Sequence, residues 1–260
     1  MSKLFLVVPV YNEEENIPGF MTNANRIARE LSQYEMTCLF VDDGSTDKTA
    51  DVVRNAEAKF CVQVISLPKN QGPGAAFATG FEWLSTRVQT DDWVVTLEGD
   101  NTSRFELLKQ MLKRTEEGYD VILASPYMYS GGISNTTAFR TFLSFVANFF
   151  VKELLGLRGL VTMSSFYRLY RGKALLKLYS VYGPRIIERT GFESMIELLM
   201  KMVYLQMRIS EVPMNLDSSL RKGKSKMKIA KTIFGYLRLW QYRSSWQAQI
   251  EELNPTAVGI

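Results

Sequence analysis

The chain has 260 residues, 46% of them hydrophobic and 22% charged, which is typical of a globular protein and excludes a mainly disordered one. Residues 1–120 hold 12 lysines and arginines against 19 acids, whereas residues 121–260 hold 19 against 8, so the second half suits an anionic partner. The sequence contains no histidine, which excludes histidine-based triads, histidine metal sites and histidine acid–base catalysis.

Two apolar runs of strand length, residues 4–10 and 38–42, end abruptly in polar residues, and a helical pattern follows each. Uninterrupted apolar runs are typical of strands that are buried on both faces of a parallel sheet. Ligands bind beyond the carboxyl ends of such strands, so the clusters at residues 11–15 and 42–47 predict a small-molecule site. Taken singly, each cluster is better explained as an ordinary strand-to-helix turn with capping residues.

Strands and helices alternate over the first 125 residues, which predicts an α/β fold with a doubly wound, mostly parallel sheet. The expected strands cover residues 4–10, 38–42, 62–67, 92–97 and 121–124. The expected helices cover residues 17–34, 46–60 and 104–117, with a further helix from the glycine-rich turn at 69–76 to about Val88. Beyond residue 125 we expect an amphipathic helix over 139–157, a helix over 191–204 and a strand near 207–212.

No internal repeat or low-complexity linker divides the chain, so we expect one domain over residues 1–228 and an amphipathic helix with a tail over 229–260. The uncharged run over residues 141–151 is far short of the roughly 20 residues that a membrane-spanning helix needs. Residues 139–157 instead predict an amphipathic helix that rests at the membrane interface. Residues 4–10 are too short for a signal peptide, and Cys38 and Cys61 are typical of buried thiols in a reducing compartment. These features predict a cytoplasmic protein that associates peripherally with a membrane.

Glu98 and Asp100 follow the expected strand at 92–97 and place two carboxylates at the mouth of the sheet. Carboxylate oxygens are the ligands that Mg²⁺ and Mn²⁺ prefer, commonly together with substrate phosphates. The same pair also suits acid–base catalysis or simple exposure to solvent, and the two residues alone leave all three interpretations open.

Two later segments are suited to anions. The turn at residues 69–76 combines glycines with a helix N-terminus, and the segment 221–228 is dense in lysine with a glycine and a serine that fit a phosphate-wrapping loop. A solvated charged face, or a patch for nucleic acid or acidic lipid, has the same composition. Residues 229–246 interleave aromatic residues with arginines, which is typical of a membrane interface and nearly as typical of a core-packing helix.

These motifs in their order resemble family 2 glycosyltransferases of the GT-A fold. The segments that carry this resemblance are Val8–Glu13, Val41–Asp47 and Asn70–Ala76. A second set is similar to the dolichol-phosphate mannose synthase branch, whose members glycosylate polyprenyl phosphates: Ser165–Arg171, Gly191–Glu193, Glu211–Pro213 and Gly223–Lys226. Together the matches cover about residues 4–230.

The resemblance implies a GDP- or UDP-linked sugar donor, a polyprenyl or dolichyl phosphate acceptor at a membrane surface, and Mg²⁺ or Mn²⁺. It assigns the nucleoside to Pro9, Tyr11, Glu13, Val41 and Asp43. Glu98, Gly99 and Asp100 stand at the family's DxD motif, in which both acids are metal ligands. The resemblance also places Arg221 or Lys222, together with Ser225 and Lys226, where basic residues meet the donor diphosphate and the acceptor phosphate. The chain departs from the family at Glu98, which replaces an aspartate, at Ser125–Tyr127, where close relatives place an arginine, and in lacking the histidine that often follows the motif. The cation before the Gly-x-Ser-Lys segment is also offset by one position.

A phosphate oxygen is anionic at pH 7, so its attack on an anomeric carbon needs no strong base, which is compatible with a chain without histidine. We expect an inverting displacement in which Asp100, Arg221 and Lys226 carry catalysis by neutralising the departing nucleoside diphosphate. A transferase for a polysaccharide or a small soluble acceptor is the alternative among enzymes, and an inactive nucleotide-sugar-binding scaffold is the alternative outside them. The acidic first half disfavours nucleic acid as a partner. Either the interface helices suffice for membrane contact, or a separate membrane protein recruits the chain.

Overall fold

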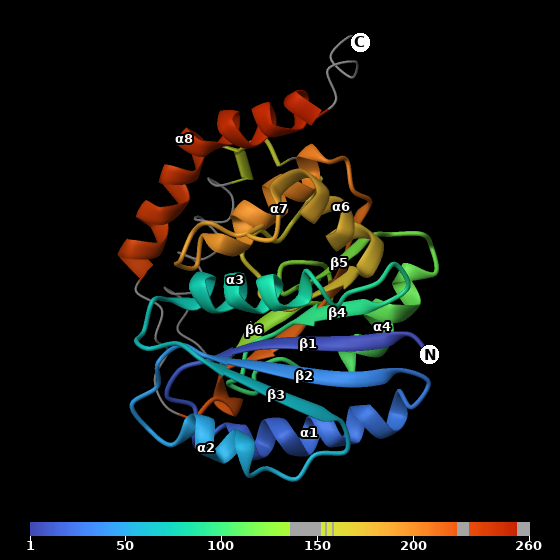
Figure 1. Ribbon diagram of the computed structural model, residues 1–260, viewed down its shortest axis with the longest axis vertical. Helices are drawn as coiled ribbons and strands as arrows, with labels where there is room; N and C mark the ends of the chain where they lie inside the picture. Colours follow the sequence, from blue (N-terminus) through green and yellow to red (C-terminus); the bar gives the residue numbers. More distant parts are fainter. Residues whose placement is uncertain (136–151, 154, 158, 223–228, 254–260) are drawn as a thin grey trace.

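The computed structural model describes residues 1–135, 152–153, 155–157, 159–222 and 229–253. A seven-stranded sheet forms its centre, in the order β3-β2-β1-β4-β7-β5-β8. All neighbouring strands pair in parallel except β7, which is antiparallel to both β4 and β5. Helices cover both faces of the sheet (Figure 1), so the predicted α/β fold with a doubly wound, mostly parallel sheet is confirmed.

The strands of this sheet are β1 (Lys3–Val10), β2 (Glu35–Asp42), β3 (Cys61–Ser66), β4 (Trp93–Thr96), β5 (Val121–Ser125), β7 (Arg168–Arg171) and β8 (Ile209–Pro213). The helices are α1 (Ile17–Glu30), α2 (Thr49–Arg54), α3 (Pro73–Leu84), α4 (Leu107–Thr115), α6 (Gly172–Tyr182), α7 (Ser194–Tyr204) and α8 (Ile229–Leu253). A separate parallel ribbon pairs β6 (Gly132–Ser134) with β9 (Asn215–Asp217), and a short 3₁₀ turn, η1 (Ser218–Leu220), follows it.

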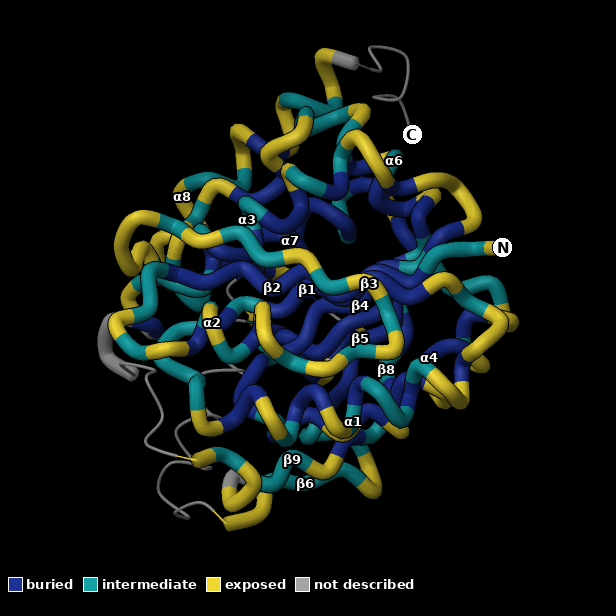
Figure 2. Tube along the Cα trace, turned by 60° about the horizontal axis from the view of Figure 1, so that its bottom comes forward, coloured by how far each residue is buried: buried dark blue, intermediate teal, exposed yellow. Residues whose placement is uncertain are grey.

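The first strand is buried on both faces because successive side chains of a strand point to opposite sides of the sheet. Phe5 and Val7 pack on the face covered by α3, α6, α7 and α8, whereas Leu4 and Leu6 pack on the face covered by α1 and α4. Figure 2 shows the inner strands as a buried layer between these two groups of helices, whereas the edge strand β3 is partly exposed. The apolar run therefore has no polar alternation, and that is why it could be recognised from sequence.

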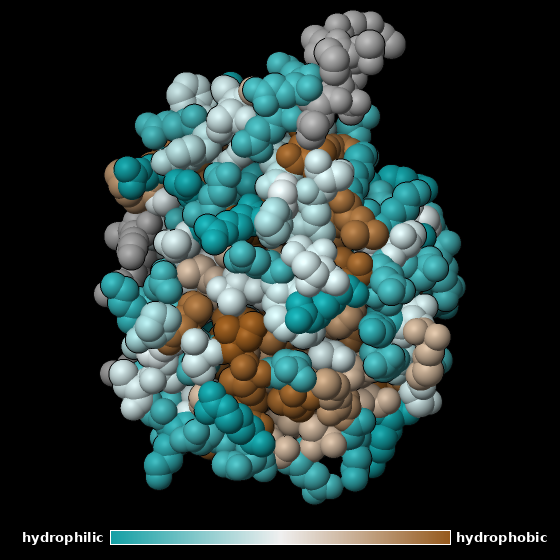
Figure 3. Space-filling model, in the orientation of Figure 1, coloured by the Kyte–Doolittle hydropathy of each residue, from teal (hydrophilic) through white to brown (hydrophobic). Residues whose placement is uncertain are grey.

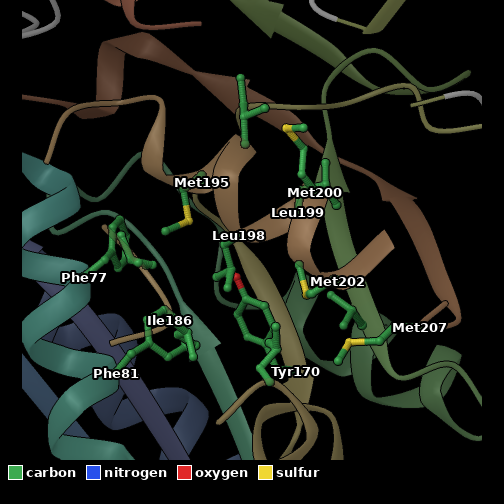
Figure 4. Close-up of a cluster of buried hydrophobic side chains, with 14 of the residues drawn as sticks. Phe77, Phe81, Tyr170, Ile186, Met195, Leu198, Leu199, Met200, Met202 and Met207 are labelled. Carbon is green, nitrogen blue, oxygen red and sulfur yellow. The ribbon is translucent and has the colours of Figure 1, made fainter. Parts of the chain in front are cut away.

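Helix α7 contributes six buried hydrophobic side chains to the core on the α3 side. Figure 4 shows Met195 and Leu198 of α7 beside Phe77 of α3 and Tyr170 of β7. Some aromatic rings on this side meet edge to face, such as Phe81 and Tyr170 with 5.8 Å between centroids, whereas Phe166 stacks on Phe192. Helix α8 covers α6 and α7 from outside (Figure 1) and buries Tyr236, Leu239 and Trp246 in the same core.

Three elements were not predicted: β7, α6 and the β6–β9 ribbon. The strand β7 begins and ends with arginine, yet Arg168 is fully buried because its guanidinium donates to the carbonyls of Ser165, Met195 and Met163 at 2.7–2.8 Å. An arginine whose three guanidinium nitrogens each donate to a backbone carbonyl is compatible with a core strand, and no sequence pattern reports that pairing.

Other predictions need correction. The helix predicted over 46–60 is shorter in the structure, because α2 covers only Thr49–Arg54 and residues 55–60 form the connection to β3. Cys38 is buried as predicted, but Cys61 is exposed because it begins the edge strand β3. In the view of Figure 3, hydrophobic residues gather on the surface over β2 and β3.

The helix predicted over residues 139–157 lies mostly outside the described residues, although Lys152, Glu153 and Leu155 are helical. Among the helices that the structure describes, none has both the length and the apolar character needed to cross a bilayer.

Candidate functional site

The carboxyl ends of β1, β2 and β4 meet at one edge of the sheet. The parallel register pairs Val10 with Asp42 and Val7 with Thr96, so the segments that follow these strands lie side by side. Gly99 makes the closest approach, since a Cβ atom there would lie 2.5 Å from Val10 Cγ1. The turn after β4 can pack against β1 in this way only with a glycine at position 99.

Hydrogen bonds between the two turns fix the segment after β1. Asn12 adopts a left-handed backbone conformation (φ 52°), and its backbone N–H donates to Ser45 Oγ at 2.9 Å. In return the Thr46 N–H donates to Asn12 Oδ1 at 2.8 Å, and the Glu13 N–H donates to Thr49 Oγ1 at 2.7 Å. The polar residues after β1 and β2 thus hold each other, and they present Tyr11 and Glu13, both half-buried, at the edge of the sheet.

Asp43 connects the end of β2 to the glycine-rich turn before α3. Its two carboxylate oxygens accept hydrogen bonds from the N–H groups of Gln71 and Gly72, each at 2.8 Å. Burial raises the pKa of Asp43 and these two hydrogen bonds oppose the rise. The nearby Val41 is fully buried beside Leu39, and it stands within the sheet between Pro9 of β1 and Ile65 of β3.

Asp100 is buried, at 5% exposure. Its Oδ1 accepts hydrogen bonds from the N–H and hydroxyl of Thr102 at 3.1 and 2.7 Å. Its Oδ2 accepts from Arg221 Nε at 2.5 Å, and Arg221 Nη2 contacts the same oxygen. The acid at the end of β4 and the cation of the late segment therefore converge on one point, as predicted.

Glu98 shares this space with Asp100. Burial raises the pKa of Glu98 to about 8, and the negative charges of Asp100 and, more weakly, Glu13 add to the rise, while Arg221 opposes it. Three carboxylates therefore act on one another at the sheet edge, with Arg221 as the counter-charge. Such a concentration of acids is costly without cations and is typical of functional sites.

The segment that carries Arg221 is attached to the start of α1. The Lys222 N–H donates to Asn16 Oδ1 at 2.8 Å, and Asn16 Nδ2 donates back to the Lys222 carbonyl at 3.0 Å. Asn16 Nδ2 also donates to Glu13 Oε2 at 2.5 Å. The sequence analysis missed Asn16, because an asparagine directly before a helix has the signature of an ordinary N-cap.

The predicted site residues thus fall into three groups. Glu13, Glu98, Asp100 and Arg221 lie together, with Gly99 between the two acids and the exposed Lys222 beside them. Pro9, Tyr11, Val41 and Asp43 lie at the ends of the neighbouring strands, and their contact with a nucleoside stays a prediction. Ser225 and Lys226 lie outside the described residues, so their roles also stay predictions.

A divalent metal fits the acids present. Within the part of the chain that the structure describes, no three or more Asp, Glu or Cys side chains form a metal-binding group. Mg²⁺ commonly needs only one or two carboxylates and completes its shell with substrate phosphates and water, and Glu98 and Asp100 can supply those two. Because Arg221 already contacts Asp100 Oδ2, a metal on that oxygen requires Arg221 to turn away from it.

Comparison with known proteins gives the class to which this fold and site belong. Residues 5–179, more than half of the chain, match the model of glycosyl transferase family 2, and the chain belongs to that family.

Among its relatives, dolichol-phosphate mannosyltransferase from Pyrococcus furiosus is 27% identical over 251 residues, which cover 96% of this chain and 66% of that protein. Polyprenol monophosphomannose synthase from Mycolicibacterium smegmatis is 29% identical over 228 residues, covering 86% of this chain and 81% of that protein. An undecaprenyl-phosphate 4-deoxy-4-formamido-L-arabinose transferase from Serratia proteamaculans is 35% identical over 125 residues, 47% of this chain and 36% of that protein. The chain thus spans just under two thirds of the archaeal relative and about a third of the arabinose transferase. The predicted resemblance to the polyprenyl-phosphate branch is confirmed.

Solved structures support the fold. Glucosyl-3-phosphoglycerate synthase from Mycobacterium tuberculosis, solved with Mn²⁺ and UDP-glucose, superposes with a TM-score of 0.62 at 16% identity, covering 95% of this chain and 79% of that one. Mannosyl-3-phosphoglycerate synthase from Rubrobacter xylanophilus superposes with a TM-score of 0.63 at 17% identity, covering 99% and 79%. The predicted GT-A architecture is therefore confirmed.

Proposed function

We propose that this protein is an inverting glycosyltransferase that moves a sugar from a GDP- or UDP-linked donor to a polyprenyl or dolichyl phosphate. The observation that supports this most is the contact between Arg221 and Asp100, which lie 121 residues apart in the chain. The contact joins a cation of the basic half to the acids at the sheet edge. The relatives named for lipid-phosphate substrates point to the same acceptor class.

In the proposed reaction Arg221 acts on the leaving group. Its planar guanidinium is suited to two phosphate oxygens at once, and it exchanges Asp100 for the donor diphosphate when the donor binds. Lys222, Ser225 and Lys226 continue the same segment and supply further contacts to the donor diphosphate and the acceptor phosphate. Neutralising the charge that develops on the departing nucleoside diphosphate lowers the barrier to transfer.

Glu98 and Asp100 would hold Mg²⁺ or Mn²⁺. Such an ion supplies Lewis-acid neutralisation of the diphosphate when it is bound. A divalent cation between these acids would also lower the pKa of Glu98, because a bound cation favours the ionised carboxylate. Pro9, Tyr11, Glu13, Val41 and Asp43 would hold the nucleoside at the neighbouring strand ends.

The acceptor proposed here needs no general base. A lipid phosphate is already ionised at pH 7, so its oxygen attacks the anomeric carbon without losing a proton to the protein. A hydroxyl acceptor would need a general base, and without histidine in the sequence that base would have to be another group, such as a carboxylate of the Glu98–Asp100 pair.

The N-terminal half of α8 is the surface we propose for membrane contact. Phe234, Leu237 and Trp240 are 60%, 53% and 49% exposed at spacings of three residues, which places them on one side of the helix. Arg238 and Arg243 stack on Phe234 and Trp240. Aromatic residues interleaved with arginines suit a membrane interface with anionic lipids, and the lysine-rich segment 221–228 directly precedes this helix.

The test uses the purified chain with a panel of GDP- and UDP-sugars, Mg²⁺ or Mn²⁺, and three acceptors: a polyprenyl phosphate, the matching polyprenol and a soluble sugar. We expect transfer to the polyprenyl phosphate alone. Transfer to the soluble sugar alone would refute the proposal of a lipid phosphate acceptor. Binding of a nucleotide-sugar without any transfer would support a binding scaffold.

A further inference from the structure

Asn16 precedes α1 but does not cap it. Its side chain makes no hydrogen bond to the first turn of the helix, although capping is the usual role of an asparagine at this position. The side chain is 4% exposed and its hydrogen bonds lead to Lys222, 206 residues later in the chain. An asparagine that is buried and directed away from its own helix has another structural role.

The contact with Lys222 uses both ends of the carboxamide. The amide oxygen accepts from the Lys222 N–H while the amide nitrogen donates to the Lys222 carbonyl. The side chain therefore pairs with the backbone as a neighbouring strand would. This pairing requires a donor and an acceptor in one plane, which aspartate and serine lack in this form. It holds the backbone of residue 222 whatever side chain that residue carries.

Arg221 therefore lies between two fixed points. On its N-terminal side, Asp217 accepts a hydrogen bond from the Ser219 N–H at 3.0 Å and another from Asn135 Nδ2 at 2.7 Å, which anchors η1 to the end of β6. On its C-terminal side stands the Asn16–Lys222 pair. With both neighbours anchored, the guanidinium is kept within reach of Asp100 instead of being free to leave the sheet edge.

We propose that Asn16 is a positioning residue, which holds the Arg221 segment over the acids and joins it to the nucleoside end of the site through Glu13. The amide nitrogen of Asn16 donates both to Glu13 and to Lys222, so one carboxamide group connects the two ends of the donor site. Asn16 acts through the Lys222 backbone and touches no substrate. Its effect on catalysis rests on the proposed function, whereas the attachment of the segment does not.

The variant that tests this is Asn16→Asp, which keeps the size of the side chain but removes the donor to the Lys222 carbonyl. Helix α1 offers a matched control in Asn25. Its Nδ2 donates to the Glu57 carbonyl at 2.8 Å and its Oδ1 accepts from the Lys59 N–H at 2.7 Å, the same kind of pairing with a distant loop. Asn16→Ala is a second variant without the added charge, for use if Asn16→Asp does not fold.

The first readout is limited proteolysis with trypsin, with cleavage after Arg221 and Lys222 followed by mass spectrometry. Loss of the hydrogen bond to the Lys222 carbonyl in Asn16→Asp, or of both hydrogen bonds to Lys222 in Asn16→Ala, should raise the cleavage rate at these bonds by about tenfold, while Asn25→Asp leaves it unchanged. Cleavage at the wild-type rate in both folded Asn16 variants would overturn the proposal, and so would an equal rise in Asn25→Asp.

The second readout is sugar transfer. We expect the Asn16 variants to lose about tenfold or more in kcat with a smaller change in the KM of the donor, because Arg221 acts mainly on charge that develops in the transition state. A loss confined to KM would contradict this part. If the wild-type protein transfers no sugar, the proposed function fails, and the proteolysis result still decides whether Asn16 holds the segment.

Discussion

Arg221 contacts Asp100 through two nitrogens of its guanidinium, and Asp100 is almost fully buried beneath it. The pair joins the segment after η1 to the end of β4. Burial opposes the charge on Arg221, but the carboxylates of Asp100, Glu98 and Glu13 raise its pKa above the usual value. The arginine is therefore charged whenever the acids are, and it contacts Asp100 directly.

Removing this cation should slow transfer more than it weakens folding. We expect Arg221→Ala to lower kcat by about 10²–10³-fold, the usual cost of losing one charge-stabilising group. Arg221→Lys should recover part of the rate, since lysine keeps the charge and loses the planar fork. Steady-state kinetics checks both variants, and Arg26→Ala is the control, because the Arg26–Glu106 pair is exposed on the surface. Equal rates for wild type and Arg221→Ala would remove Arg221 from the reaction.

Lys201 of α7 is the second important cation, and its role is structural. Its ammonium donates to Glu197 at 2.8 Å and both side chains are fully buried, while Glu197 also accepts from the N–H groups of Glu188 and Arg189. Lys201→Met would leave a buried carboxylate without its cation, which typically costs about 3–5 kcal/mol. Urea denaturation measures this, and the double variant with Glu197→Gln should lose less.

The loss in Lys201→Met should depend on pH. Burial raises the pKa of Glu197 and Lys201 opposes that rise, so the variant raises the pKa further. A carboxyl whose pKa is higher in the folded state than in the unfolded state lowers stability as pH rises above its unfolded pKa. The variant should therefore be closer to wild type at pH 5 than at pH 8. A difference in unfolding free energy between wild type and Lys201→Met that does not change with pH would contradict this role of the Lys201–Glu197 pair.

The glycine-rich turn should be sensitive to a single methyl group. A Cβ at Gly74 would lie 2.2 Å from the Arg189 carbonyl oxygen, which is backbone and must move. Gly74→Ala should cost about 1–3 kcal/mol by overpacking and disturb the turn held by Asp43. Gly132→Ala is the control, because its Cβ would meet only Asn215 Oδ1 at an ordinary 3.4 Å. Thermal unfolding of the two variants compares them directly, and equal melting temperatures would show that the turn has room to adapt.

The proposed membrane surface can be tested by reversing its character. Leu237→Glu and Trp240→Glu place acids on the exposed face of α8, whereas Gln247→Glu adds the same charge farther along the helix, also at an exposed position. Flotation with anionic vesicles should show binding by wild type and by Gln247→Glu, with at least about a tenfold loss for the other two. Undiminished binding by Leu237→Glu would exclude this face of α8 as the membrane-contact surface.

The parts of the fold that could be predicted are those with a local cause. The apolar runs of β1 and β2 are continuous because both faces of the strands are buried, and the polar residues after them are local consequences of the strand ends. Asp100 and Arg221 could be proposed as partners only because their motifs resemble a family. Nothing in the spacing of the two residues reports their contact.

The parts that could not be predicted depend on contacts between distant segments. Arg168 gives β7 a charged end, and its burial depends on carbonyl groups from a loop and from α7. Asn16 resembles a helix cap, and its true partner is 206 residues away. The exposure of Cys61 follows from the position of β3 at the sheet edge, which is a property of the strand order and not of the strand sequence.

The most direct test of the central claim is the binding of GDP and UDP, measured by calorimetry with Mn²⁺ and with EDTA for wild type, Asp100→Asn and Arg221→Ala. We expect one of the two nucleotides to bind wild type at least about tenfold more tightly with Mn²⁺, Asp100→Asn to abolish that gain, and Arg221→Ala to weaken binding under both conditions. Equal affinities for all three proteins, with and without Mn²⁺, would contradict the claim that these acids and this arginine act on one diphosphate.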